Sequence, residues 1–339
     1  MELQSSFLHN IDISKDEAEE INILLNSTNI NSYIEELLDD ILSNPNRRLF
    51  TFKPGNTEVK SSFPSIINNS DDLNKIIKHN ANRLLDKERE SQSFMDSRNL
   101  GVNIQKGSLM HLYFLDEGIS KIIICKVEHD EILSERNFEK ISGLNTKRRV
   151  FKAILIVFGE NNNIEQTVVF DRNNSKYWWD EFLELNQINT DGENTEKSLT
   201  EIDNVLSSLK REYHADYTIL RNGIISHYRN NEQLNFSEII DSEVVNYTPV
   251  NENFPKQRLI AQLVNLPVNK GFDSQFTIVR SKIKKRIQQK IKLAPNLYLS
   301  IDDTVENLRN LIKTKIDESG NKIVEIISDD GYNQLKDLT

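Results

Sequence analysis

The spacing of apolar positions changes along this chain, and the change predicts where helices give way to strands. Up to about residue 95, apolar residues mostly recur every three or four positions, as on the buried face of a helix. The clearest such stretch runs from Tyr33 to Leu42 and ends at Asn44-Pro45, because proline disfavours a helical conformation of the residue before it. Residues 1–95 are therefore expected to be mostly helical, with one short strand at residues 47–52.

Runs of consecutive apolar residues dominate the next part of the chain. Lys121–Val127 and Val150–Phe158 are apolar almost throughout, which is typical of strands buried on both faces. Asn161-Asn162-Asn163 can turn the second run into Glu165–Phe170, and this pair predicts a hairpin. We expect a central, mostly antiparallel sheet that is covered by the N-terminal helices.

An aromatic segment and a polar segment follow the sheet. Tyr177–Leu183 predicts a helix that holds both tryptophans of the chain. Because neighbouring residues of a helix point in different directions, we expect one tryptophan in the core and the other against a second domain or a partner. Residues 187–198 are polar and contain Asp191-Gly192, which predicts a linker.

These patterns predict an α+β protein with two domains. Residues 1–186 would form a domain of N-terminal helices packed on a mostly antiparallel sheet. After the linker at 187–198, residues 199–339 would form a mainly helical domain that ends in a small β hairpin. The elements expected there are helices at 199–213, 217–228 and 257–266, and strands at 276–279, 297–301, 312–316 and 322–327.

The second domain also contains the segment that bears most on function. Residues 280–292 carry seven cations and no carboxylate, in a chain of 339 residues whose formal net charge is −10. The spacing of Ile283, Ile287 and Ile291 predicts a helix with one apolar stripe and with cations on its other faces. Such a local excess of positive charge indicates a polyanionic partner, although a solvated helix face would have the same pattern. The seven cations of this basic segment are Arg280, Lys282, Lys284, Lys285, Arg286, Lys290 and Lys292.

Two further basic spots lie in the first domain. Lys147, Arg148 and Arg149 precede a predicted strand, where they could contact DNA or pair with surface carboxylates, and Arg47-Arg48 is the other spot. Lysine predominates in the basic segment and acts as a point charge, so we expect weak sequence preference. Few aromatic residues interleave with the basic segment, which favours duplex DNA over single strands.

Composition bears on the compartment and on the chemistry. The single cysteine, Cys125, lies in an apolar run, which predicts a buried residue and permits no intramolecular disulfide. The N-terminus lacks the features of a signal sequence, and no apolar run approaches the ~18 residues of a membrane span. We therefore expect a cytoplasmic protein without membrane insertion. No phosphate-binding loop, dinucleotide fingerprint or helical histidine pair occurs, so no cofactor or metal is predicted.

Two alternatives to simple DNA binding stay open. Glu128-His129-Asp130-Glu131 follows a buried strand and Asp171 ends a neighbouring one, as in nucleases that hold magnesium at strand ends. The same residues would also fit a solvated acidic turn. The other alternative is an interaction or DNA-binding subunit of an anti-phage defence system, with a protein partner that the sequence does not identify.

The order of these segments resembles the 37-kDa nucleoid-associated protein family of bacteria (the NdpA type) from about Phe50 to the C-terminus. In typical members the aromatic helix continues into a basic, glycine-rich stretch, whereas residues 184–189 are not basic here, so no DNA contact is inferred at that point. The resemblance implies a cytoplasmic, nucleoid-associated DNA-binding protein that acts as a homodimer, and it does not imply an enzyme. The segments that carry it are Thr57-Glu58-Val59, Asn80–Leu85, Ile122–Val127, Phe151–Ile156, Tyr177–Leu183 and the basic segment before Leu297–Ile301.

Overall fold

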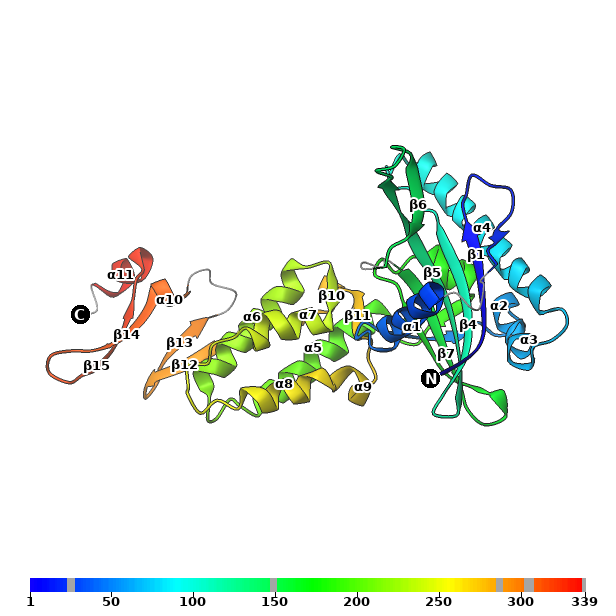
Figure 1. Ribbon diagram of the computed structural model, residues 1–339. Helices are drawn as coiled ribbons and strands as arrows, with labels where there is room; N and C mark the ends of the chain where they lie inside the picture. The colour runs from blue at the N-terminus through cyan, green and yellow to red at the C-terminus, as the bar shows by residue number, and fades with distance from the viewer. Residues whose placement is uncertain (23–27, 147–150, 285–288, 302–307, 337–339) are drawn as a thin grey trace.

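A computed structural model places a sheet domain, a helical domain and a small C-terminal β region in a row (Figure 1). The structure describes residues 1–22, 28–146, 151–284, 289–301 and 308–336. The predicted α+β class is confirmed, with N-terminal helices on an antiparallel sheet, a helical region and a C-terminal hairpin. None of the described helices is long and apolar enough to cross a bilayer.

The first domain is built on a nine-stranded sheet whose described pairings are all antiparallel. The strand order is β2-β1-β4-β5-β7-β8-β3-β9, and β6 also pairs with β5. The two apolar runs predicted as buried strands form parts of β5 and β7, and the predicted hairpin partner of the second run forms β8. The strands are β1 (Glu2–Ile11), β2 (Glu19–Glu20), β3 (Arg48–Phe52), β4 (Gly107–Asp116), β5 (Ile119–Leu133), β6 (Lys140–Leu144), β7 (Phe151–Phe158), β8 (Ile164–Phe170) and β9 (Leu185–Gln187).

Helices cover both faces of the sheet because successive residues of the central strands point to opposite sides. Helix α1 (Thr28–Leu42) packs against the face that includes Ile123 and the fully buried Cys125, as expected for this cysteine. The other face includes Ile122 and Ile124 and packs against α4 (Leu73–Ser97). The same face is also covered by α2 (Glu58–Ser61), α3 (Phe63–Asn68) and the π-helix η2 (Tyr177–Phe182), and a short 3₁₀ turn, η1 (Glu160–Asn162), joins β7 to β8.

The expectation of mostly helical structure over residues 1–95 is wrong at the N-terminus. Strand β1 pairs along its whole length with β4, so the first residues of the chain extend the sheet. Its side chains alternate between the two cores, with Leu8 in one and Ile11 in the other. A segment with so few apolar positions shows no clear period by itself, and the open edge of β4 decides its conformation.

The two tryptophans both pack within the first domain. Trp178 is fully buried, and the ring of Trp179 lies 5.4 Å from that of Phe50, centroid to centroid. The expectation that one of them packs against the second domain is therefore wrong, and contact of the partly exposed Trp179 with a partner stays a prediction. The π-helical geometry of η2 winds the chain more widely than an α-helix, and both indoles reach the same core.

The second domain is helical and has its own hydrophobic core, which draws on residues from Leu199 to Ile278. The helices predicted at 199–213, 217–228 and 257–266 correspond to α5, α6 and α8. Its elements are α5 (Asp191–Ser207), α6 (His214–Asn230), β10 (Gln233–Asn235), α7 (Phe236–Ile240), the π-helix η3 (Asp241–Val245), α8 (Lys256–Val264), α9 (Leu266–Lys270) and β11 (Gln275–Thr277).

Most of the predicted linker, residues 187–198, is part of α5. Thr190 caps this helix through a reciprocal pair of hydrogen bonds with Glu193, which fixes its start. Three of the polar residues that suggested a linker, Asn194, Thr195 and Ser198, are buried. Asn194 pairs with Asp273, and Ser198 contacts the hydroxyl of Tyr228. These polar residues therefore belong to the helical domain. The chain that joins the two domains is limited to the few residues between β9 and α5.

The C-terminal region consists of short paired strands. The strand predicted at 297–301 and the terminal hairpin are both confirmed. Its elements are the 3₁₀ turn η4 (Arg280–Lys282), β12 (Gln289–Ala294), β13 (Leu297–Ile301), α10 (Leu308–Leu311), β14 (Ile312–Ile316), β15 (Lys322–Ile326) and α11 (Asp329–Leu335). Strand β12 pairs with β13, and β14 pairs with β15.

Candidate nucleic-acid interface

The basic segment leaves the second domain beside the first turns of α5. The backbone N–H of Val279 donates to Thr195 Oγ1 at 3.0 Å, and Ile283 packs against the core of the second domain. These two contacts fix the start of the segment on the surface. Arg280, Lys282 and Lys284 are all exposed there.

The predicted helix over residues 280–292 is wrong in the part that the structure describes. The segment begins with the short turn η4 and ends in strand β12. Within β12, Lys290–Leu293 alternates between lysine and apolar residues, which suits a strand, and β13 supplies its hydrogen-bonding partner. Ile283 and Ile291, the two isoleucines of the stripe that are described, therefore do not lie on one face of a helix.

Acidic residues of α5 lie close to two of the described cations. Lys284 Nζ is 2.5 Å from Glu196 Oε1, and this hydrogen bond lowers the pKa of the Glu196 carboxyl below its usual range. Lys282 lies near the start of α5. Hydrogen bonds with Thr190 are the main cause of the lowered pKa of Glu193, and the charge of Lys282 also lowers it. Part of the positive charge is thus already balanced, whereas Arg280 forms no ion pair with any described residue.

The other predicted contact residues are only partly placed. Lys285, Arg286, Lys147, Arg148 and Arg149 lie outside the described residues. The backbone positions of Lys290 and Lys292 on β12 pair with Ser300 and Tyr298 of β13. The Tyr298 side chain is 46% exposed, so an aromatic ring accompanies the basic strand, a feature that the sequence pattern alone did not indicate.

The third basic spot, Arg47-Arg48, is structural. Arg48 is 2% exposed, and its Nη2 lies 2.6 Å from Asp191 Oδ1 at the start of α5. Arg47 donates to the carbonyls of Leu42 and Asn44. The pair joins the first domain to the second, and Arg48 is not accessible to phosphate.

The carboxylates of the nuclease alternative, Glu128, Asp130 and Asp171, each contact different partners. Glu128 faces Lys152 at 3.4 Å, and Asp130 accepts a hydrogen bond from Asn145. Asp171 accepts backbone N–H groups of Asn173 and Ser175 at 3.1 and 2.6 Å, as in a loop closure. Within the described ranges, no three histidine, cysteine or acidic side chains converge as metal ligands would.

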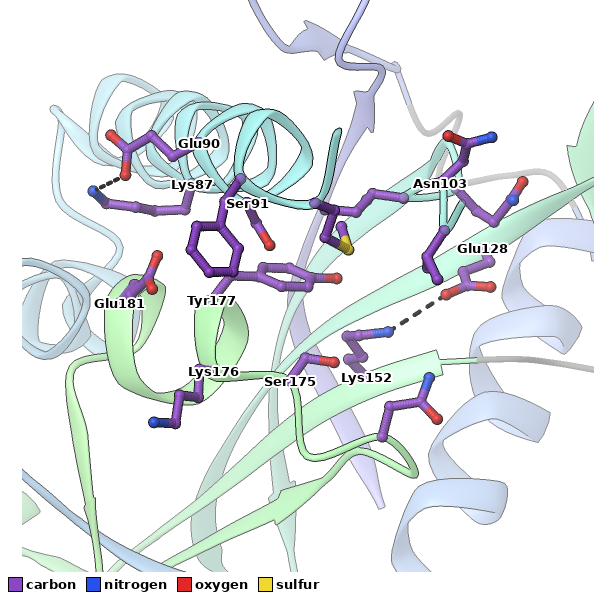
Figure 2. A pocket seen from close by; sticks show the side chains of 16 residues that line it. Lys87, Glu90, Ser91, Asn103, Glu128, Lys152, Ser175, Lys176, Tyr177 and Glu181 are labelled. Carbon is purple, nitrogen blue, oxygen red and sulfur yellow. Dashed lines mark hydrogen bonds and ion pairs between the residues drawn. The ribbon is translucent and has the colours of Figure 1, made fainter. Parts of the chain in front are cut away.

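The first domain also contains a cavity that the sequence pattern did not indicate. It has a volume of about 870 Å³ and lies between α4, the loop after it, β5, β7 and η2 (Figure 2). Its residues come from segments far apart in the chain, so no local motif marks it. The sequence had singled out the aromatic segment that begins at Tyr177, and Glu128 as part of the nuclease alternative, but it gave no sign that the two line one cavity.

Comparison with models of protein families and a search of curated proteins found no match to this chain. The resemblance to nucleoid-associated proteins thus depends on the segments quoted above and on their order.

Proposed function

We propose that the chain is a non-catalytic, sequence-tolerant DNA-binding protein of the cytoplasm and nucleoid that acts as a homodimer. The observation that carries this proposal is the basic segment: seven cations without a carboxylate in residues 280–292 of a chain with net charge −10. The exposure of Arg280, Lys282 and Lys284 supports it, since phosphate contacts need accessible cations.

Counterion release gives the proposed binding a measurable signature. If five or six of the seven cations engage phosphates, the slope of log affinity against log salt is roughly −4.5 to −5.5. Lys284 must exchange its contact with Glu196 for a phosphate, which weakens its net contribution. The contacts would hold the protein on the duplex backbone and would read little of the base sequence.

The C-terminal region supports the homodimer. It contributes ten of the 26 exposed large apolar side chains in the described part of the chain. Two-stranded hairpins are marginally stable alone, so β12–β13 and β14–β15 need a further packing surface. In a two-fold dimer, the C-terminal regions of the two subunits would cover each other. The dimer would also bring two basic segments near one DNA, and the higher effective concentration would raise the affinity. The ten residues are Leu293, Leu297, Tyr298, Leu311, Ile316, Val324, Ile326, Ile327, Tyr332 and Leu335.

A gel-shift titration tests the proposal. Labelled duplexes of unrelated sequence are titrated with the full chain at about 50 and 200 mM salt, with and without magnesium. We expect binding that falls steeply with salt and leaves the DNA intact. Arg280→Glu/Lys282→Glu should weaken binding by at least about tenfold at the lower salt.

A matched control separates the site from overall charge. Lys15→Glu/Lys75→Glu makes the same change in net charge on exposed positions of the first domain and should leave affinity nearly unchanged. Equal weakening by both pairs would refute a specific role of the basic segment. Cleavage that requires magnesium would refute the non-catalytic assignment and point to Glu128, Asp130 and Asp171.

A further inference from the structure

The cavity in the first domain has the size and shape of a small-molecule site. Its volume of about 870 Å³ falls within the roughly 300–1,000 Å³ of ligand pockets. Figure 2 shows Tyr177 near its centre, Lys87 and Glu90 of α4 on one side, and the Lys152–Glu128 pair on the other. None of the described residues of the basic segment lines it, so we treat the cavity as a site separate from the proposed DNA contact.

Lys152 is a nearly buried cation with free hydrogen-bonding capacity. Its side chain is 9% exposed, and its one hydrogen bond to a described side chain is a long one, 3.4 Å to Glu128 Oε1. Its Nζ also lies 5.9 Å from the centroid of the Tyr177 ring. An ammonium carries three N–H donors, and a buried one without full partners is costly. An anionic group of a ligand would supply the missing acceptors.

Aromatic and apolar side chains line the same cavity. The Tyr177 ring extends across it in Figure 2, and Phe94 of α4, which is 53% exposed, adds a second ring to the lining. Burial raises the pKa of the Tyr177 phenol, so its hydroxyl remains protonated and can donate. Met95 and Ile104 complete an apolar lining that suits a flat ring.

The cavity adjoins a rigid part of the domain. The buried pair Lys126–Glu88 lies next to it, and Lys126 Nζ also donates at 2.7 Å to the carbonyl of Gln105, a lining residue. Gly107 allows this approach, because a Cβ there would lie 2.9 Å from Lys126 Cε and 2.4 Å from the carbonyl oxygen of Val127. These contacts preorganise the site, which lowers the entropic cost of binding.

The charges of the lining limit the ligand. Three lysines and three glutamates face the cavity, so its formal charge is balanced and a polyphosphate is not favoured. We propose that the cavity binds a nucleoside monophosphate, with its base against Tyr177, its phosphate at Lys152 and its ribose hydroxyls donating to glutamates. The six charged residues are Lys87, Lys152, Lys176, Glu90, Glu128 and Glu181.

Calorimetric titration of the full chain with AMP, CMP, GMP and UMP tests this proposal. At least one of them should bind with one site per chain. Lys152→Met keeps the aliphatic stem, removes the charge and should weaken binding by about tenfold or more. Ser91→Trp, on the α4 side of the cavity, should abolish binding by filling the space. Lys121→Met, on the same sheet but outside the lining, is the matched control and should bind as the wild type does.

Three results would overturn the assignment. One is the absence of binding by all four nucleotides up to about 5 mM. Another is binding that Ser91→Trp leaves unchanged, which would place the site elsewhere. The third is inorganic phosphate binding as tightly as the nucleotides, since the ring would then contribute nothing. Thermal melts check that each variant is folded, and if Lys152→Met does not fold, Ser91→Trp decides. Arg280→Glu/Lys282→Glu should leave nucleotide binding intact.

Discussion

The ammonium of Lys126 lies 2.6 and 2.8 Å from the two carboxylate oxygens of Glu88, and both side chains are almost fully buried. This ion pair joins β5 at the centre of the sheet to α4, which covers it. Burial raises the pKa of Glu88 and lowers that of Lys126, and the attraction between the two opposes both shifts. Loss of either partner would therefore leave the other ionisable group buried without compensation, which lowers the free energy of unfolding.

Replacing Lys126 with methionine should reduce the free energy of unfolding by about 3–5 kcal/mol, because Glu88 would remain buried without a cation. Urea denaturation measures the change. Lys121→Met on the same strand, whose partner Asp116 is partly exposed, should cost less than about 1 kcal/mol. Adding Glu88→Leu to Lys126→Met should recover much of the loss, and a double variant no more stable than the single one would contradict this account.

The contact between the domains gives a second prediction. Asp273 is 2% exposed and accepts hydrogen bonds from the backbone of Leu49 on β3 and from the side chain of Asn194 on α5. In Asp273→Ala both donors lose this buried acceptor, which should cost about 2–5 kcal/mol. Because the contact joins β3 to the helical domain, we also expect faster proteolysis at residues 188–190. Unchanged proteolysis with lowered stability would show that the contact stabilises one domain only.

Those buried polar residues also explain what the sequence could and could not predict. The central strands and the terminal hairpin were predictable, since an apolar run such as Lys121–Val127 can only be buried. Asn194, Thr195 and Ser198 were assigned to a linker because they are polar. Their hydrogen-bond partners are distant in the chain, and no local pattern reveals them. Burial of such residues depends on tertiary hydrogen bonds, and a single sequence does not show them.

The basic segment and the cavity also differ in how far the sequence could predict them. The positive charge of the basic segment was evident from the sequence, but its conformation was not, because β12 needs β13 to form. The acids of α5 that face Lys282 and Lys284 are about ninety residues earlier in the chain, so their effect was not foreseen. The cavity depends entirely on segments that the fold brings together. Local composition therefore indicated the proposed DNA contact, and only the fold revealed the pocket.

Two buried histidines predict the response to acid. The ring nitrogens of His9 and His111 have no hydrogen-bond partner among the described residues, and burial lowers the pKa of His111 to about 3. The positive charge of a protonated His9 is a smaller contribution to this lowering. The unfolded chain, with a histidine pKa near ~6.5, binds more protons than the folded one between these values. Stability should thus be constant above pH ~6.5 and fall below it, with His111 contributing a loss of about 2 kcal/mol at pH 5.

His111→Leu tests this assignment. It removes the titrating ring and keeps an apolar side chain of similar size, so the difference in unfolding free energy between pH 7.5 and pH 5 should shrink by about 2 kcal/mol. At pH 7.5 the variant should be about as stable as the wild type, since the ring nitrogens have no partner to lose. Urea denaturation at the two pH values measures both quantities. An unchanged difference would mean that acid acts through other groups.

The exposed C-terminal region makes the proposed dimer testable apart from DNA. Ile316 and Tyr332 are 68% and 71% exposed, and a second copy would bury them. Ile316→Ser/Tyr332→Ser should raise the dissociation constant of the dimer by at least about tenfold, as sedimentation velocity would measure. Ile132→Ser/Val268→Ser replaces side chains of similar exposure, 62% and 78%, outside this region and should leave the assembly unchanged.

A link between assembly and DNA binding follows from two-fold symmetry. A monomer presents one basic segment and loses the effective concentration of the second, so Ile316→Ser/Tyr332→Ser should bind duplex DNA more weakly and with a shallower salt dependence. Neither residue is a cation, so a direct electrostatic effect cannot produce that change in slope. If the variant is monomeric and its salt slope equals that of the wild type, each subunit binds DNA independently. If the variant and the wild type are both monomeric at all concentrations, the C-terminal region is covered by something other than a second copy.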